Sequence, residues 1–402
     1  MLAPLLVAAA LAAPERVVVL PPVGPGEGAP GWIGAAVEET LPRALQRIGL
    51  DALSASDRRR VLEGLGISGP VASHATGVRV AEAVGARLLV IGSWDLAGTE
   101  LHLAVRPLDT TTAALGAEIR AGGALEDLGR LIDELARGLA AAAGKPAEPA
   151  RPPLPFAALR ALGEALIARD AESRVQGLRR ALAAQPGYSD AALVLARQLY
   201  DAGRFADARA ALAALQPEPA FVRELRFLDG ACLLGLGKPA DADVLYAELG
   251  GADPTPAVLA NRAVARLRLW PSASGASALL RQALERAPFA ADLPFALGWA
   301  LFVEGDLEGA TSSLRTAVHN APGDAKARIA LSWALRPAHS DEADEQWRAA
   351  AALDPSLESQ RLYAGPKQRL ERVLPSEAAL VNDPARLAEA RASGSRGTSG
   401  RR

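Results

Sequence analysis

The sequence Ala276-Ser-Ala-Leu-Leu280-Arg-Gln-Ala283-Leu-Glu-Arg-Ala-Pro288 carries a spacing that recurs through half of the chain. A small residue is followed four positions later by a large apolar one, then three later by a small or apolar one and five later by proline. Side chains spaced in this way share one face of an α-helix, and proline cannot continue a helix. The spacing therefore predicts an amphipathic helix, with small residues on its packing face, that ends before Pro288.

The same spacing returns along the chain in one register. Its lead positions are residues 174, 208, 242, 276, 310 and 343, so the step is 34 residues four times and then 33. Gly203, Gly237 and Gly305 stand five residues before lead positions, where a positive φ ends a preceding helix. Each period is thus predicted to be a pair of helices joined by a turn. Such a pair cannot bury its apolar face alone, so neighbouring pairs must stack into a solenoid.

This period, with its small and large residues, resembles the tetratricopeptide repeat (TPR) family. The resemblance covers residues 156–356 and implies an all-α superhelical TPR solenoid of about six units. In that family the first helix of each unit lines a concave surface that binds a protein or peptide. Carried onto this chain, the repeat phase gives these groove candidates for partner binding: Arg197, Tyr200, Asn261, Arg262, Arg268, Phe295, Trp299 and Phe302.

The groove candidates admit a second interpretation. Aromatic residues beside arginines are the usual composition of a binding hot spot. Phe295, Trp299 and Phe302 fit equally well as side chains that fill the solenoid core. Some TPR proteins clamp the C-terminal carboxylate of a partner, but Phe227, Asn261 and Phe295 stand where that clamp has lysine. A partner is therefore expected to bind in some other way.

Residues 14–144 alternate short strand patterns with helical ones and predict a small α/β domain ahead of the solenoid. Arg16–Leu20 is a β-branched run bounded by prolines, which is typical of a buried strand. Further strands are predicted near residues 87–94, 99–107 and 113–121, and helices near 31–49, 57–66, 76–85 and 125–143.

Three motifs in this domain, Val17–Pro21, Val84–Ser93 and Arg106–Thr111, resemble the amino-terminal domain of TolB and its relatives FlgO and CsgG. The resemblance covers residues 14–143 and implies an envelope-associated binding domain. The sequence departs from the family at Pro22, where an aromatic residue is usual, and it lacks the lipid-anchoring cysteine of FlgO and CsgG.

The chain starts with an apolar run, residues 1–13, in which Ala10-Leu-Ala12 fits a signal-peptidase site. No basic residue precedes this run, and it is too short to span a bilayer. We expect a cleaved signal peptide and a periplasmic or secreted protein, with no membrane span and no lipid anchor. A cytoplasmic protein with an apolar start is the alternative.

Three further segments complete the predicted organisation. Residues 145–155 are proline-rich and predict an extended linker between the two domains. Residues 357–391 break the repeat period and are expected to form a capping helix or two. Residues 392–402 are rich in glycine, serine and arginine and predict a disordered tail.

The sequence contains no recognisable catalytic, metal-binding or cofactor-binding constellation. The 44 basic and 46 acidic residues nearly cancel, which gives no electrostatic reason to expect a nucleic-acid partner. The four histidines have no metal-binding spacing, and Cys232 lies in an apolar stretch as a small core residue. Glycine-rich residues 24–28 lack a phosphate-binding lysine, and Asp95 and Asp109 are predicted to form turns.

The leading hypothesis is a non-enzymatic adaptor of the bacterial cell envelope that binds a peptide or protein segment in the solenoid groove. One alternative is a ligand-sensing or regulatory protein whose N-terminal domain binds a small molecule. Two others are a cytoplasmic assembly factor and an enzyme whose site is not recognisable from sequence.

Overall fold

The computed structural model of the chain describes residues 16–26, 29–67, 74–145, 152–215, 218–269, 271, 275–363, 365 and 368–380. The chain forms two compact units. Residues 1–58 and 69–169 belong to the first unit, and residues 59–68 and 170–402 belong to the second. The expected signal peptide, the expected tail and residues 146–151 of the expected linker lie outside the described residues.

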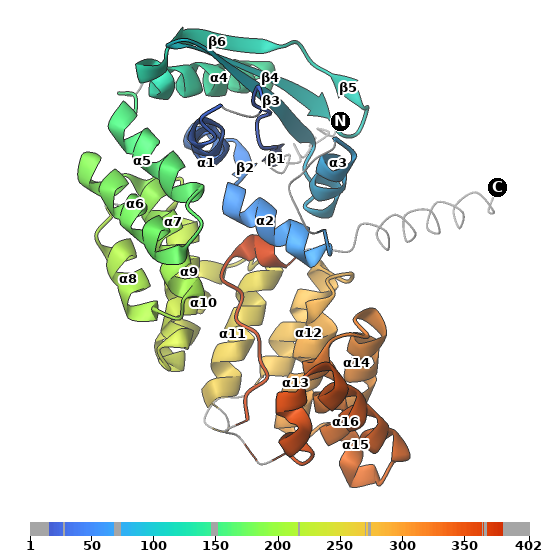
Figure 1. Cartoon of the computed structure of the whole chain (residues 1–402). Helices are drawn as coiled ribbons and strands as arrows, with labels where there is room; N and C mark the ends of the chain where they lie inside the picture. Colours follow the sequence, from blue (N-terminus) through green and yellow to red (C-terminus); the bar gives the residue numbers. More distant parts are fainter. Residues whose placement is uncertain are drawn as a thin grey trace, which may run out of the picture. The chain divides into compact units, whose positions relative to one another are not determined.

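The first unit is built on a mixed six-stranded sheet with the order β2-β1-β3-β4-β5, in which β6 also pairs with β4 (Figure 1). β1 lies parallel to β2 and β3, whereas the pairs of β4 with β3, β5 and β6 are antiparallel. Gly98, with a φ of 65°, turns the hairpin between β3 and β4. The strands are β1 (Arg16–Val19), β2 (Asp51–Leu53), β3 (Leu88–Ala97), β4 (Glu100–Asp109), β5 (Ala114–Leu115) and β6 (Ile119–Ala124).

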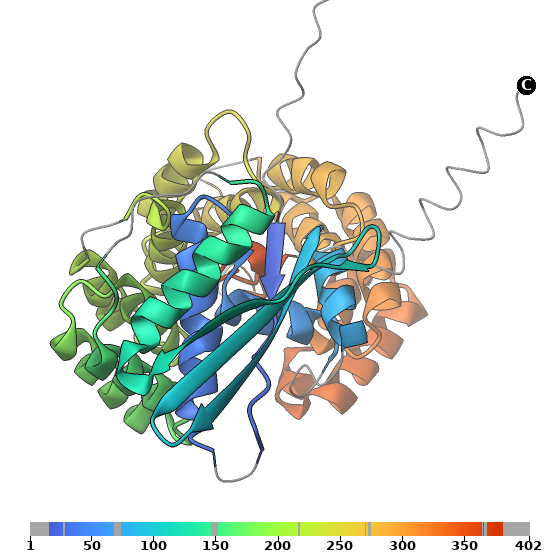
Figure 2. The same ribbon diagram turned by 90° about the horizontal axis from the view of Figure 1, so that it is seen from above.

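Helices cover both faces of this sheet (Figures 1 and 2). Val17 of β1 faces a cavity that Leu45 of α1 and Leu139 of α4 also line. Leu20 points to the opposite face, since side chains alternate along a strand. There it meets α3, where a Cβ added to Gly77 would lie 2.7 Å from its Cδ1. Helices α1 (Trp32–Arg47), α3 (His74–Ala83) and α4 (Leu128–Ala142) belong to the first unit, and α2 (Ala55–Gly64) starts in the first unit and ends in the second.

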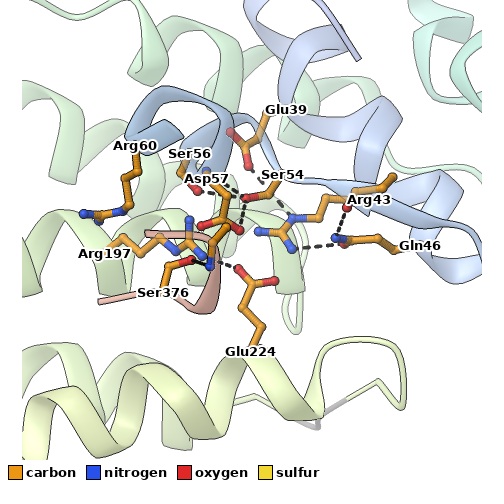
Figure 3. A network of polar contacts seen from close by, with 12 residues as sticks. Glu39, Arg43, Gln46, Ser54, Ser56, Asp57, Arg60, Arg197, Glu224 and Ser376 are labelled. Atoms are coloured by element: carbon orange, nitrogen blue, oxygen red, sulfur yellow. Dashed lines mark hydrogen bonds and ion pairs between the residues drawn. The ribbon is translucent and has the colours of Figure 1, made fainter. Parts of the chain in front are cut away.

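Side-chain hydrogen bonds fix the start of α2 and the end of α1. The Ser54 hydroxyl accepts from the Asp57 N–H at 3.1 Å and donates to the Asp57 carboxylate at 2.7 Å (Figure 3). The first bond satisfies the backbone N–H of Asp57, which has no acceptor within the helix. The Asp57 carboxylate also places a negative charge at the N-terminal end of α2, where the helix dipole is positive. On α1, Arg43 donates to Gln46 at 3.1 Å, and Gln46 donates to the carbonyl of Ala52 at 2.6 Å. The second bond ties α1 to β2.

The first unit contains one strand that the sequence does not predict. β2 is only three residues long, too short to show an alternating pattern, and it forms by pairing with β1 from Arg16 opposite Asp51. The strand expected over 113–121 is two shorter strands, β5 and β6, on β4. The helix expected over 125–143 starts as a 3-10 turn, Leu125–Asp127, before α4. The predicted α/β class is otherwise confirmed.

The second unit is a TPR-like solenoid, as the repeat register predicts. All six lead positions fall on alternate helices, from α6 to α16, and the small lead residues from Ala208 to Ala343 are at most 2% exposed. Gly203, Gly237 and Gly305 have φ values of 72°, 70° and 91°, as expected for the turn within each pair. The helices are α6 (Ala171–Ala184), α7 (Ser189–Asp201), α8 (Phe205–Ala213), α9 (Val222–Gly235), α10 (Pro239–Gly250), α11 (Pro256–Leu269), α12 (Ala276–Arg286), α13 (Asp292–Glu304), α14 (Leu307–Asn320), α15 (Ala325–Leu335) and α16 (Asp341–Leu353).

The first period of the repeat differs from a regular helix pair. Its first helix, α5 (Phe156–Leu166), belongs to the first unit and packs there against α1. A Cβ on Gly163 would lie 2.2 Å from the carbonyl oxygen of Trp32, so only glycine permits this approach. The Phe156 ring meets the Trp32 ring edge-on, with 5.9 Å between centroids. The repeat array of the second unit therefore starts with α6, followed by five helix pairs.

The C-terminal part of the second unit also differs from expectation. Within the described part of the expected capping region, α16 is followed by a 3-10 turn, η3 (Pro355–Gln360), and residues 368–380 form no helix or strand apart from the 3-10 turn η4 (Glu377–Ala379), with a bend at Pro375 and Ser376. Pro375 lacks an amide hydrogen and opposes a continuous helix here. Figure 1 shows this segment in red, running alongside α11. Residues 381–391 lie outside the described residues.

The close approach of α13 and α14 gives a prediction for stability. A Cβ on Gly298 would lie 2.6 Å from Leu314 Cγ and 3.0 Å from the Leu314 nitrogen. Gly298→Val should lower the free energy of unfolding by about 1–3 kcal/mol, because overpacking pushes the two helices apart. Denaturant titration followed by circular dichroism measures the change. Gly323→Val places its side chain in open space and should change that free energy by no more than about 0.5 kcal/mol. Equal losses in both variants would contradict the packing argument.

Candidate functional site

The first helices of successive pairs, α9, α11, α13 and α15, form a groove in the second unit that already holds a segment of the same chain. We call residues 368–380 the C-terminal segment. The groove residues that contact this segment lie on, or directly before, helices far earlier in the sequence. They are Arg223, Thr255, Asn261, Arg268, Asp292, Phe295 and Asp324.

Asn261 of α11 binds the backbone of the C-terminal segment at the middle of the groove. Its Oδ1 accepts from the Leu374 N–H at 2.8 Å, and its Nδ2 donates to the Leu374 carbonyl at 2.8 Å. Nδ2 also donates to the Tyr246 hydroxyl at 2.8 Å, and that hydroxyl donates to the Phe227 carbonyl at 3.0 Å. Burial raises the pKa of Tyr246 well above its usual value, so the phenol stays neutral and keeps its proton for this bond. The chain of bonds fixes the orientation of the Asn261 amide.

Two arginines hold carboxylates on either side of this position. Arg268 of α11 meets Glu371 at 2.9 Å, and their side chains are only 14% and 4% exposed. Arg268 also donates to the Leu234 carbonyl at 2.6 Å. At the other end, Arg223 of α9 meets Glu377 at 2.7 Å, and Thr255 donates to the same carboxylate at 2.6 Å. The groove therefore binds two acidic side chains at separate points.

Arg372 is held by a clamp of the opposite charge. Its guanidinium bonds to Asp292, at the start of α13, and to Asp324, which caps α15. The same guanidinium lies 4.5 Å from the centre of the Phe295 ring, within cation–π distance. Burial alone would lower the pKa of Arg372, but Asp324 and Asp292 more than offset that effect and the pKa is raised. The residue stays charged in the groove.

An aromatic cluster extends the groove beyond the segment. Tyr363 lies 5.0 Å from Phe302, 6.0 Å from Trp299 and 5.4 Å from Trp333, measured between ring centroids. Trp299 is 2% exposed and Phe295 1% exposed, so both belong to the solenoid core. The core interpretation therefore holds for these two residues, which also contact the chain's own C-terminal residues, and binding of a partner by them stays a prediction.

Three of the groove candidates have other partners. Arg197 of α7 forms an ion pair with Glu224 of α9 at 2.7 Å, and both are labelled in Figure 3. Arg262 meets Asp243 of α10 at 2.9 Å. The Tyr200 ring packs edge-on to Phe205 of α8 at 5.3 Å, and burial raises the pKa of Tyr200 to about 12. These side chains connect neighbouring helices, whereas Asn261, Arg268, Phe295, Trp299 and Phe302 gather around the C-terminal residues.

Sequence reasoning missed the groove residues at the N-terminal ends of the first helices. Arg223 is the second residue of α9, Thr255 directly precedes α11, and Asp292 starts α13. Asp324 directly precedes α15 and caps it. Thr255 and Asp292 lie about two helical turns ahead of Asn261 and Trp299, and that spacing is the signal that could have identified them.

Other residues with chemical potential have structural surroundings. Burial, and then the charge of Asp229, raise the pKa of the Cys232 thiol to about 12, so it stays neutral. Hydrogen bonds from Thr111, together with Arg87, lower the pKa of Asp109, which forms the predicted turn. Asp95, expected in a turn, instead lies within β3 opposite His102. Within the described ranges, no three histidine, cysteine or acidic side chains are placed to hold a metal ion.

The first unit contains an apolar cavity of about 240 Å³ between the sheet and the helices α1 and α4. Aliphatic side chains supply most of its lining, and Asp109 lies at one side. The lining includes Val17, Leu45, Leu50, Leu88, Val90, Leu115 and Leu139.

Comparisons with known proteins identify similar folds but no family. No protein-family profile matches the sequence, and no curated protein matches it. The structure is similar to the Cut9 chain of the APC/C Cut9–Hcn1 hetero-tetramer, with 16% identity, a TM-score of 0.44, and coverage of 51% of this chain and 42% of that one. The chain thus spans less than half the length of Cut9.

Two smaller TPR proteins are matched almost over their full lengths. YrrB, described as having an unusual peptide-binding site, is 16% identical with a TM-score of 0.35, covering 47% of this chain and 100% of YrrB. A MamA chain from residue 41 to the end, from Desulfovibrio magneticus RS-1, is 18% identical with a TM-score of 0.36, covering 41% of this chain and 94% of that one. Among the residues that the structure describes, no helix combines the length and the apolar character needed to cross a bilayer.

Proposed function

We propose that this chain is a non-enzymatic scaffold whose groove binds an extended segment of a partner protein. The observation that carries the proposal is the pair of hydrogen bonds between the Asn261 side chain and the backbone of Leu374. Every extended peptide offers the same N–H and carbonyl groups. A single amide side chain that satisfies both can therefore hold a peptide backbone whatever side chain stands at that position.

The surroundings of Asn261 favour peptide binding over catalysis. The charged groove residues Arg223, Arg268, Asp292 and Asp324 each face a side chain of opposite charge in the C-terminal segment. Such pairs fix the position of a bound chain along the groove, and aromatic anchors beside arginines are typical of binding hot spots. The proposed role of these groups is recognition, with no cofactor and no metal.

Binding to the groove can be tested after the resident segment is weakened in the full chain. We call the variant with Glu371→Ala, Arg372→Ala, Leu374→Ala and Glu377→Ala the vacated chain. A fluorescent peptide with the sequence of residues 368–380 should bind it saturably in an anisotropy titration. When Asn261→Ala is added to the vacated chain, the affinity for this peptide should fall by about 5- to 100-fold, because two hydrogen bonds to the peptide backbone are lost.

Asn320→Ala is the matched control, because Asn320 is the last residue of α14 and has no place in the groove. It should leave the affinity of the vacated chain unchanged. The absence of saturable binding, or equal effects of the two asparagine substitutions, would refute the peptide-binding proposal.

The proposed scaffold works in the bacterial cell envelope. The first unit carries the motifs that resemble TolB-type domains, and we propose that it engages an envelope component while the groove holds a protein segment. Export through the apolar residues 1–13, and hence a periplasmic or secreted location, is part of the same proposal.

Export makes a prediction about the mature N-terminus. If residues 1–13 are a signal peptide, protein recovered from the producing bacterium should start close to Ala13. N-terminal sequencing of periplasmic and cytoplasmic fractions measures this directly. A chain that retains Met1 and stays in the cytoplasmic fraction would support the assembly-factor alternative instead.

A second candidate function rests on the apolar cavity of the first unit. Its volume of about 240 Å³ and its aliphatic lining suit a small apolar molecule, as a ligand-sensing protein would need. Short-chain fatty acids and aromatic hydrocarbons should raise the melting temperature of the full chain in a thermal-shift assay, because they bind only the folded state. Val90→Trp, which fills the cavity, should abolish the shift. A shift that persists in this variant would place the ligand elsewhere.

A further inference from the structure

We propose that the C-terminal segment blocks the groove of its own chain, and that the partner is an extended peptide with the same pattern of side chains. That pattern is an acidic residue followed by arginine, an aliphatic residue three positions after the acid, and a second acid six positions after it. It stands in this chain as Glu371, Arg372, Leu374 and Glu377. The inference rests on the peptide-binding function proposed above.

The segment contacts all four helices of the groove, so a second backbone cannot make the same contacts while the segment is bound. Arg372 contacts α13 and α15, Leu374 is bound by α11, and Glu377 is bound by α9. The segment therefore runs from the last helix pairs back towards the earlier ones. Because Asn261 uses both polar groups of its amide on Leu374, a partner can take this position only after the segment leaves.

The first acidic position is specific because its ion pair is buried. Glu371 is 4% exposed and Arg268 is 14% exposed, so neither charge is well solvated when the groove is filled. A partner with a neutral residue at this point would leave Arg268 buried with only the Leu234 carbonyl as its acceptor. Removing one member of a buried pair is strongly unfavourable. Peptides without this carboxylate are therefore rejected.

Two carboxylates and an aromatic ring recognise the arginine that follows this acid. Asp292 and Asp324 come from different helices, and Phe295 supplies the face on which the guanidinium lies. A lysine would present a point charge and could not bridge two carboxylates while stacking on the ring. The groove therefore distinguishes arginine from lysine at this position.

The second acidic position sets the length of the pattern. Glu377 follows Glu371 by six residues, which can separate the two positions by at most about 20 Å. Arg223 and Thr255 receive it on α9 and before α11, whereas Arg268 receives Glu371 near the end of α11. A peptide with its acids closer together or in a helix would satisfy only one of the two sites.

The covalent connection decides how strongly the segment competes. A segment joined by a short connection acts at an effective concentration of about 1 mM, whatever the concentration of the protein. If the segment alone binds the groove with a Kd of about 10–100 μM, a partner peptide should bind the unaltered chain about 10- to 100-fold more weakly than the vacated chain. The segment thus sets a threshold that only a strong or locally concentrated partner exceeds.

A second copy of this chain is a poorer candidate for the partner. Exchange of segments between two copies would form the same contacts that each copy already makes within itself. It would add no favourable contact to offset the entropy lost on association. The charge pattern therefore points to a different protein, and a concentration-dependent dimer in light scattering would contradict this choice.

The test compares the unaltered and vacated chains with one labelled peptide, residues 368–380. We expect the vacated chain to bind it about 10- to 100-fold more tightly than the unaltered chain. In the vacated chain, Arg268→Glu should weaken this peptide by at least about 10-fold and favour a peptide with lysine in place of Glu371. Arg315→Glu is the control, since Arg315 lies on α14 and pairs with Glu342 of α16.

The outcomes separate this inference from the function on which it rests. Equal affinity of the unaltered and vacated chains, with binding still dependent on Asn261, would overturn self-blocking and leave the peptide groove intact. Equal affinity of the vacated chain for the peptide with Glu371 and for the peptide with lysine at that position would overturn the proposed side-chain pattern. No binding to a vacated chain that keeps its helical circular dichroism would overturn both proposals.

A measurement on the unaltered chain covers the case in which the vacated chain does not fold. A ¹³C-labelled peptide of residues 368–380, distinguishable by mass from the chain's own fragments, is added at saturating concentration during hydrogen exchange. Displacement should increase deuterium uptake by the resident segment, because its bonds to Asn261 are broken. Unchanged uptake at saturation would contradict the proposal.

Discussion

The solenoid depends on the close approach of paired helices at their smallest residues. Gly298 on α13 faces Leu314 on α14, and Ala310 at the lead position is fully buried. Each pair formed in this way leaves one apolar face uncovered, and the next pair covers it. This stacking brings the first helices α9, α11, α13 and α15 into one row. The groove is thus a consequence of how the repeat buries its own surface.

A peptide in this groove creates a problem that Asn261 solves. Burying a backbone amide without a partner is costly, so the N–H and carbonyl of Leu374 need hydrogen bonds. The Asn261 amide supplies both, and the neutral Tyr246 hydroxyl fixes its orientation. With the backbone satisfied at one point, the ion pairs at Glu371 and Glu377 set the register of the chain in the groove.

The sequence predicts those features of the molecule that are periodic and fails for those that depend on distant contacts. The repeat register follows from side chains spaced along one helix, and so do groove positions such as Asn261. Arg197 and Arg262 occupy the right phase but pair with Glu224 and Asp243 on other helices, a choice that spacing cannot reveal. The C-terminal segment has no period at all. Its position depends on contacts such as Glu371 with Arg268, which are 103 residues apart.

Where the repeat period breaks, a helix or turn packs against something other than the next helix of the repeat. At the start of the array, α5 keeps the helical pattern of the repeat, but Gly163 and Phe156 bring it against α1 within the first unit. At the end, the last helix α16 is covered by the 3-10 turn η3, and Arg361 lies over the Trp347 ring while it bonds to Asp344. The residues that follow then return along the groove. A terminal repeat must be covered by something other than another repeat, and here the covering chain also fills the groove.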